Sequence, residues 1–285
     1  MNLKETAKEI REILEQKRKE LNLSFFEDTH TYTMDDINGE TKDDWYSVSK
    51  VIKKFYEEFD SDGIAEKKAK GDPIIKAQLL KEWADAGTYS TNVGSRTHYF
   101  LEKKSIELFE LNKEVRQPVF ECDFVQVLKS DSMITAGINF LNLMKERGGE
   151  LLDTELVLGN PELLYVGQPD QMWLFLDKTG KEIGFVISDF KTNKIKNFEV
   201  NNFTKPMYVP FQKHPNNALG HYYLQLPFYV KLFIKMLEGS KYENIKFLGG
   251  IIVLLKDDGK FEEFRVPKDV TTTIMNMDMK KYLTT

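Results

Sequence analysis

An acid and an amine at the end of an apolar run are the residues of this chain best suited to chemistry. Residues 186–188 lead into Asp189, Phe190 and Lys191, and such a run is typical of a buried strand. Side chains alternate along a strand, so Asp189 and Lys191 are expected to point to the same side. Burying either charge alone costs free energy, which makes a metal ion or an anionic substrate their expected company.

One further acid and a histidine could complete a metal site with this pair. Asp170 and Asp189 are expected on adjacent strands of a hairpin that turns at residues 177–180. Magnesium prefers carboxylates and water, and His98 would add a nitrogen that also suits manganese. We therefore expect one or two Mg²⁺ or Mn²⁺ ions, and such ions can activate the water that a reaction such as phosphodiester hydrolysis requires. Lys191 would orient or deprotonate that water and stabilise the phosphate.

Four short motifs place these residues in a definite order along the chain. They are G-x-x-x-H-x-x-x-E at residues 94–102, G-x-x-D at 167–170, D-x-K at 189–191 and Q-x-x-x-Y at 225–229. Together they resemble the RecB-like exonuclease branch of the PD-(D/E)XK nuclease superfamily. Residues 46–52 are also similar to a segment of phage and mitochondrial genome-maintenance exonucleases. The resemblance covers roughly residues 30 to 265, and each motif alone has little specificity.

The resemblance implies a fold, an activity and a set of roles. The implied fold is α/β, with a restriction-endonuclease-like core and a helical layer added at the N-terminus. The implied activity is a metal-dependent DNA exonuclease that acts at DNA ends or in single-stranded DNA during recombination, replication or repair. The predicted catalytic residues are Asp170, Asp189, Lys191, Glu155, Gln225 and Tyr229. The predicted metal ligands are His98, Asp170, Asp189 and Phe190.

The segment of residues 191–214 is the best candidate for contact with nucleic acid. It carries five lysines and one glutamate, with four aromatic residues between them. Proteins that bind single strands use lysines along the phosphates and aromatic rings against the bases. A surface loop with its aromatic side chains turned inward is an equally acceptable interpretation. The predicted nucleic-acid contacts are Arg96, Glu102, Lys194, Lys196, Tyr208 and Lys213.

Each candidate residue also has a purely structural interpretation. Asp189 and Lys191 could form a simple ion pair, and Asp170 could shape a turn. His98 could be a packed or solvated helical residue, and Glu155 could be a solvated position of an alternating strand. Tyr229 could be a core residue. The function is open in the same way, because the chain could be a site-specific endonuclease, an inactive nucleic-acid-binding subunit, or an assembly protein whose acids bind a divalent ion.

Composition limits the settings in which the chain could work. The net charge of −5 is unusual for a protein that coats duplex DNA, so any contact with DNA is expected to be local. Cys122 is the single cysteine, which excludes an intrachain disulfide and a four-cysteine iron–sulfur cluster and fits a reducing, cytoplasmic setting. The longest apolar run, 247–255, is too short for a membrane span. Without a phosphate-binding loop, unwinding would need a helicase, and a single-strand-binding or annealing protein is a second possible partner.

The positional pattern predicts the elements that would hold the site. We expect one nuclease domain over 1–285, in which residues 1–91 form an N-terminal elaboration, 92–266 the core with a helical insertion at 121–148, and 267–285 a C-terminal helix. Helices are predicted at 3–21, from Ser47 or Ser49 to 59, at 61–90 with a break at 71–73, and at 92–113, 121–147, 217–238 and 268–283. A hairpin is predicted at 23–36, and strands at 151–158, 163–176, 182–191, 245–255 and 261–266. Residues 192–216 are expected to be irregular.

Overall fold

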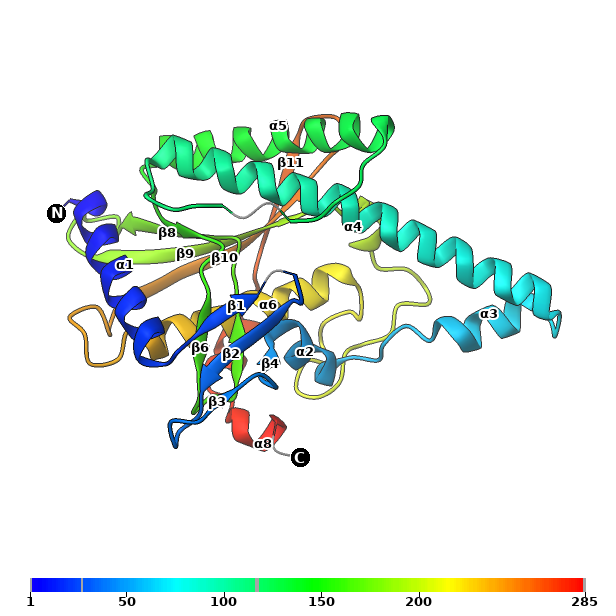
Figure 1. The fold of residues 1–285 in the computed structure, drawn as a ribbon, viewed down its shortest axis with the longest axis horizontal. Helices are drawn as coiled ribbons and strands as arrows, with labels where there is room; N and C mark the ends of the chain where they lie inside the picture. The colour runs from blue at the N-terminus through cyan, green and yellow to red at the C-terminus, as the bar shows by residue number, and fades with distance from the viewer. Residues whose placement is uncertain (1, 27, 116–117, 284–285) are drawn as a thin grey trace.

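A mixed five-stranded sheet organises the chain in the computed structural model, which describes residues 2–26, 28–115 and 118–283 (Figure 1). The strand order is β11-β10-β9-β8-β5. β9 and β10 are parallel, and the other neighbours are antiparallel. The strands are β5 (Glu150–Thr154), β8 (Gln171–Leu176), β9 (Ile183–Lys191), β10 (Lys246–Leu255) and β11 (Phe261–Arg265). The predicted mixed α/β class and the hairpin of β8 and β9 are therefore confirmed.

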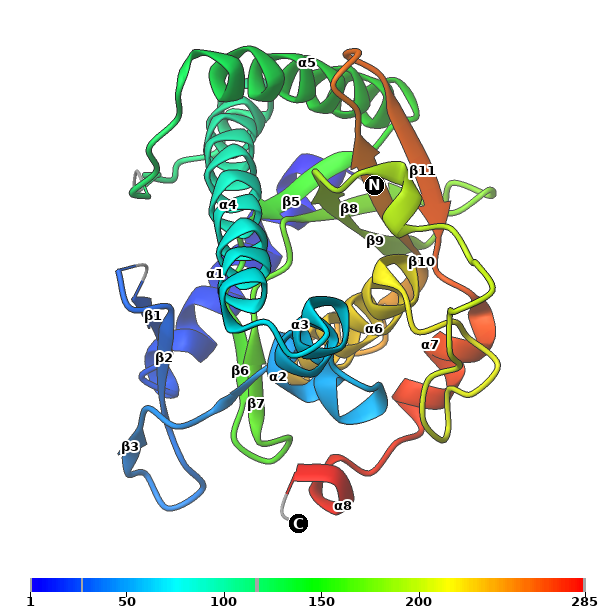
Figure 2. The ribbon, with the colours of Figure 1, turned by 90° about the vertical axis from the view of Figure 1, so that its right-hand side faces the viewer.

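The parallel pair requires a crossover, and helix α6 (Ala218–Met236) supplies it between β9 and β10. Asn217 caps this helix by accepting a hydrogen bond from Gly220 N–H at 2.8 Å. The helix runs through Pro227 without ending. It covers one face of the sheet, whereas α5 (Phe124–Glu146) covers the other (Figure 2).

Alternation along the strands divides the core between these two faces. Trp173 and Phe190 point toward α4 (Pro73–Phe109) and α5, where they pack with Phe140. Leu174 and Ile187 point the other way, into the cluster formed with α6 and α1 (Leu3–Glu20). Because Phe190 faces α4 and α5, its neighbours Asp189 and Lys191 face the side of α6.

Helix α4 differs from the prediction of two helices. The expected break is present, since α3 (Ser61–Ala69) ends before Asp72, which caps α4 ahead of Pro73. The predicted second start at Gly94 is wrong, because α4 continues through it for 37 residues. A single glycine costs a helix only about 1 kcal/mol. Helix α3 and the first half of α4 form an arm that projects beyond the sheet (Figure 1).

Two predicted strands are each divided in the structure. Residues 151–158 form β5 and β6 (Leu158–Asn160), because Glu155 adopts a left-handed φ of 47° that ends the first strand. Residues 163–176 form β7 (Tyr165–Gly167) and β8. β6 and β7 leave the central sheet and join β4 (Tyr46–Ser47) in a small sheet of order β4-β7-β6.

The remaining elements follow the predicted ranges with three changes. β1 (Ser24–Phe26) and β2 (Thr31–Asp35) form the predicted hairpin and extend to β3 (Thr41–Lys42). Ser47 caps α2 (Val48–Ile52) as expected, but the helix ends in a 3-10 turn at Lys53–Phe55 rather than at residue 59. The predicted closing helix is two helices, α7 (Lys268–Met275) and α8 (Met279–Leu283). Residues 192–216 are irregular except for a 3-10 turn at Ile195–Asn197.

None of the helices in the described ranges is both long and apolar enough to cross a bilayer.

Candidate functional site

The predicted site residues come together where α4 crosses the ends of the central strands. His98 lies on α4, Glu155 follows β5, Asp170 precedes β8, and Asp189 lies near the end of β9. The pairing of β8 with β9 places Gln171 opposite Ser188, which brings the two aspartates next to that pair together. The site is thus built from segments that are up to about ninety residues apart in the sequence.

A histidine and two carboxylates form the tightest part of this group. His98 Nδ1 lies 3.4 Å from Asp170 Oδ2 and 3.9 Å from Glu155 Oε1. One ligand atom from each of the three residues lies within 4.8 Å of the others, the only such group found among the described residues. The predicted convergence of His98 and Asp170 is present. The third member is Glu155 and not Asp189, which differs from the predicted ligand set.

The backbone around Glu155 explains how a residue beyond a strand end reaches the site. Its left-handed φ turns the chain out of β5, and its N–H donates to Asp170 O at 2.9 Å. Thr154 Oγ1 donates to the same carbonyl at 2.9 Å. Gln168 Nε2 donates to Glu155 Oε2 at 3.0 Å and holds the carboxylate. The prediction that Glu155 sits inside an alternating strand is therefore wrong, while its placement in the site agrees with the prediction.

Asp170 is fixed by the strand on its other side. Its Oδ2 accepts a hydrogen bond from Phe190 N–H at 2.6 Å, so a main-chain donor of β9 orients this carboxylate toward His98. Phe190 was predicted as a metal ligand, and its side chain is buried in the core cluster against Phe140. In this structure the backbone N–H of Phe190 donates to Asp170, which is itself a candidate metal ligand.

Asp189 and Lys191 form a buried ion pair beside this group. The side chains are 1% and 14% exposed, and the ammonium contacts Asp189 Oδ2. That oxygen accepts no hydrogen bond of regular geometry from any described residue. Alternation along β9 turns both residues toward α6, whereas His98 approaches from α4. This explains why Asp189 pairs with the lysine instead of joining His98, and it confirms that the acid and the amine share one face of the strand.

The pKa values of the three carboxyl groups reflect burial and the charges around them. Burial raises the pKa of Glu155 to about 7, with a contribution from Asp170 that the neighbouring His98 offsets in part. Burial and the Asp170 charge likewise raise the pKa of Asp189 to about 6, although Lys191 opposes this. Burial also disfavours ionised Asp170, but His98, Lys191 and the Phe190 N–H outweigh it and lower the pKa of that carboxyl.

The two cationic groups respond in the opposite sense. Burial lowers the pKa of His98, but the charges and hydrogen bonds of Asp170 and Glu155 outweigh it and raise the pKa well above its usual value. Burial lowers the pKa of Lys191 as well, yet Asp189 and Asp170 raise it above the ordinary range of lysine. Without another cation, the carboxylates thus draw protons onto the site near neutral pH.

This donor set fits a divalent metal ion. One imidazole nitrogen and two carboxylates within reach of one another suit Mn²⁺, and the carboxylates suit Mg²⁺. A cation would also stabilise the ionised forms of Glu155 and Asp189, whose pKa values burial and the Asp170 charge raise.

The Q-x-x-x-Y pair lies next to the site on α6. Gln225 Nε2 donates to the Tyr229 hydroxyl at 2.7 Å, so the two side chains share one face of the helix as predicted. Gly167 is required here, because a Cβ at this position would lie 2.5 Å from Tyr229 Cε1 and 2.7 Å from Val48 Cγ2. The glycine of G-x-x-D therefore lets β7 approach α6. Tyr229 itself is buried in the core.

Two predicted nucleic-acid contacts on α4 have protein partners. Arg96 reaches α5, where it pairs with Asp131 at 2.7 Å, and its side chain is mostly buried. The structure therefore does not bring Arg96 to the site. Glu102 lies 3.8 Å from the Lys113 ammonium and lines a cavity of about 270 Å³ with Glu155 and Gln168.

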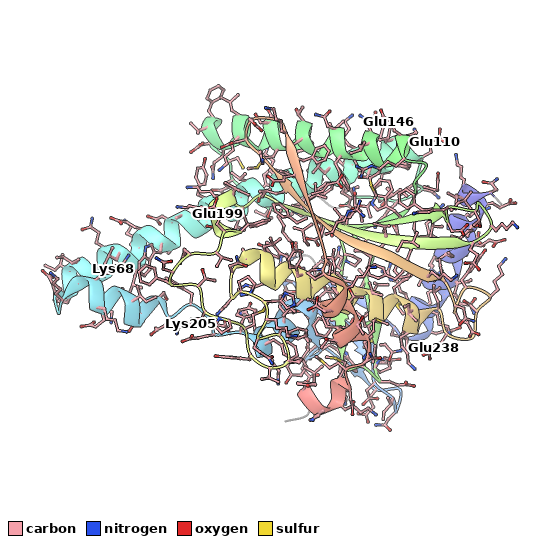
Figure 3. All side chains as sticks on the ribbon, turned by 180° about the vertical axis from the view of Figure 1, so that it is seen from behind. Lys68, Glu110, Glu146, Glu199, Lys205 and Glu238 are labelled. Carbon is pink, nitrogen blue, oxygen red and sulfur yellow. The ribbon has the colours of Figure 1, made fainter. Side chains whose placement is uncertain are left out.

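The segment of residues 192–216 divides its aromatic side chains between core and surface. Phe198 and Phe211 are buried, whereas Phe203 is 92% and Tyr208 50% exposed. The predicted contacts Lys194, Lys196 and Lys213 are exposed. Lys205 pairs with Glu57 at 2.6 Å, which ties the segment to the chain entering the arm; Figure 3 marks Lys205 on this segment and Lys68 on the arm.

Sequence reasoning missed Tyr222 and Gln168, both of which contact site residues. Tyr222 places its ring centroid 4.4 Å from the Lys191 ammonium, and Gln168 holds Glu155. Gln168 lies inside the G-x-x-D motif, which could have drawn attention to it. Tyr222 lies three residues before Gln225 and therefore on the same side of α6. This spacing was the only sequence signal that could have indicated a position near the site.

Comparisons with known protein families and with curated proteins find no match to this chain.

Proposed function

We propose that this protein is a metal-dependent phosphodiester hydrolase that degrades DNA from its ends or as a single strand. The observation that carries the proposal is the convergence of His98, Glu155 and Asp170 beside the buried pair of Asp189 and Lys191. A structural ion pair would explain Asp189 and Lys191 alone. It would not explain why His98, Glu155 and Asp170 gather next to that pair.

The proposed ion is Mg²⁺ or Mn²⁺, held by His98, Glu155 and Asp170. When bound, such an ion supplies positive charge beside the phosphate and makes water more acidic. Gln168 and the Phe190 N–H orient the two carboxylates, which pre-organises the ligands.

Lys191 is the group of this chain that acts on the reacting phosphate. Its ammonium carries a positive charge at all working pH values, because the neighbouring aspartates raise its pKa. We therefore assign it the stabilisation of negative charge on the phosphate and the orientation of the attacking water by hydrogen bonding. The raised pKa argues against the alternative role of deprotonating that water. Asp189 holds the ammonium at the edge of the site.

The order of elements supports the finer assignment to a restriction-endonuclease-like core of RecB-like type. An antiparallel run of β5, β8 and β9 is followed by the crossover helix α6 and the parallel strand β10. The four motifs lie on α4, before β8, at the end of β9 and on α6. In this proposal, the exposed lysines and rings of residues 192–216 contact the nucleic-acid strand, because that segment leaves β9 immediately after Lys191.

The test is digestion of end-labelled single- and double-stranded DNA with magnesium or manganese. We expect progressive shortening from an end by the parent protein, and loss of cleavage by Asp189→Asn and Lys191→Ala variants that remain folded. A parent protein without metal-dependent cleavage would contradict the proposal. Variants that matched the parent would contradict the assigned roles.

A covalently closed circular DNA distinguishes the two nuclease classes. An end-dependent enzyme leaves a single-stranded or duplex circle intact and degrades it after linearisation, whereas an endonuclease cuts the circle. Addition of a helicase or a single-strand-binding protein to the linear duplex tests whether such a partner increases the rate. We expect this increase if single strands are the substrate.

A further inference from the structure

The proposed catalytic lysine has a second contact besides Asp189. Tyr222, on the first half of α6, places its ring centroid 4.4 Å from the Lys191 ammonium, within the range of a cation–π interaction. The ring is held at its other end, because the Tyr222 hydroxyl donates to Asn193 Oδ1 at 2.8 Å. Asn193 follows Lys191 by two residues, so the Tyr222 ring is held between the side chains of two residues of the same short segment.

These contacts restrict where the ammonium can point. A lysine has three N–H donors on a flexible four-carbon stem. In this structure Asp189 lies against the ammonium and the Tyr222 ring lies against it as well. The side chain is only 14% exposed. An ammonium held by two partners keeps a donor for a third, and in the proposed reaction this donor is available to the substrate.

We propose that Tyr222 is a positioning residue that holds the Lys191 ammonium for the reacting phosphate. The inference rests on the proposed function, because it assigns a role in that same reaction. It extends the function by naming a residue that lies outside all four motifs.

If Tyr222 served only to pack the core, its substitution would have different effects. Its ring also meets Phe198 edge-on, with centroids 5.9 Å apart, so removal of the ring must disturb some packing. Packing alone would lower stability and would not separate kcat from KM. Tyr223 is the matched control, because it is the next tyrosine on α6, is half-buried and packs against the same core cluster.

The first experiment compares Tyr222→Leu, Tyr222→Phe and Tyr223→Leu in metal-dependent cleavage of a labelled DNA strand. Loss of a cation–π contact of about 1.4 kcal/mol corresponds to about a 10-fold lower rate. We therefore expect Tyr222→Leu to lower kcat about 10-fold with KM nearly unchanged. Tyr222→Phe keeps the ring and should stay within about 3-fold of the parent. Tyr223→Leu should retain the parental kcat.

The second experiment detects the contact without relying on activity. The ε-methylene signals of lysines are recorded by NMR in the metal-free protein, with Lys191 assigned from the Lys191→Arg variant. The ring current of Tyr222 should shift the Lys191 signal upfield. The shift should persist in Tyr222→Phe and Tyr223→Leu and disappear in Tyr222→Leu.

The outcomes separate this inference from the proposed function. A parent protein that does not cleave DNA contradicts the function and, with it, the role of Tyr222. An active parent with unchanged kcat in Tyr222→Leu contradicts only the role of Tyr222. Equal losses in Tyr222→Phe and Tyr222→Leu would also overturn it, because the aromatic face would then not be the active feature.

Discussion

The partly buried site and the segment that follows it use charge in opposite ways. In the site, charged groups from distant parts of the chain lie together, and burial with the nearby Asp170 charge raises the pKa of Glu155 to about 7 and that of Asp189 to about 6. In the segment of residues 192–216, Lys194 and Lys196 lie in solvent. Tertiary structure therefore brings the charges of the site together, whereas the charges of the segment are neighbours in the sequence.

This contrast indicates different contributions to the proposed reaction. Enclosed charges act strongly on a bound phosphate, because water does not screen them well. Exposed lysines act on the DNA backbone through a screened interaction that salt weakens. Substitutions in the site should therefore change the rate of the chemical step, and substitutions in the segment should change the affinity for DNA.

The largest effect is expected from the site itself. His98→Ala and Asp170→Asn each remove a candidate metal ligand, and several kcal/mol of charge stabilisation correspond to a loss of kcat of at least about 10³-fold. Steady-state cleavage of end-labelled DNA measures this loss. Asp257→Asn, in an exposed turn, is the control and should match the parent. Full activity in either site variant would contradict the assignment of the chemical step to the site.

A smaller effect is expected from the exposed lysines. The Lys194→Ala, Lys196→Ala double variant should raise KM about 10-fold and leave kcat unchanged, because each lysine contributes mainly to phosphate contact. The dependence of log KM on log salt should become shallower by about 0.7 per lost single-strand contact. The matched control is Lys178→Ala, Lys181→Ala, in the turn at the far end of the β8–β9 hairpin. A fall in kcat instead of a rise in KM would contradict the division of roles.

The smallest effect concerns stability without metal. Glu155 and Asp189 have a raised pKa in the folded protein, so the folded state holds protons that the unfolded state has released between about pH 4.5 and 7. His98 also has a raised pKa and acts in the same direction. These groups therefore favour folding at lower pH. The contribution of Asp189 is lost as the pH rises through about 6, that of Glu155 through about 7, and that of His98 as the pH rises through its raised pKa in the folded protein.

Glu155→Gln tests this pH dependence by thermal unfolding in a chelator. The variant should be more stable than the parent by about 1 kcal/mol at pH 8, and the difference should shrink toward pH 5.5. Manganese should raise the Tm of the parent at pH 8 and have little effect on the variant. Equal stability of the two proteins at both pH values would contradict the raised pKa of Glu155 in the folded protein.

Local sequence signals predicted the elements that depend on local physics. The break before Pro73, the cap at Ser47 and the β8–β9 hairpin all follow from residue types within one turn of the chain. The convergence of His98 and Asp170 was predicted from motifs in a known order. These parts required no knowledge of how distant segments pack.

The remaining features depend on tertiary contacts. Glu155 leaves its strand because Thr154 and its own N–H bind the Asp170 carbonyl, and no local signal marks that turn. Helix α4 continues past Gly94 although a glycine there permits an end. Tyr222 has the residue type of an ordinary core position, and only its place beside Lys191 distinguishes it.

Anomalous diffraction at the manganese edge from a crystal grown with Mn²⁺ tests the central claim most directly. We predict a peak within bonding distance of His98, Glu155 and Asp170, about 2.0–2.3 Å from nitrogen and oxygen ligands, and no peak at this position in His98→Ala crystals. A map without density at this position, or with the ion elsewhere on the protein, would contradict the account.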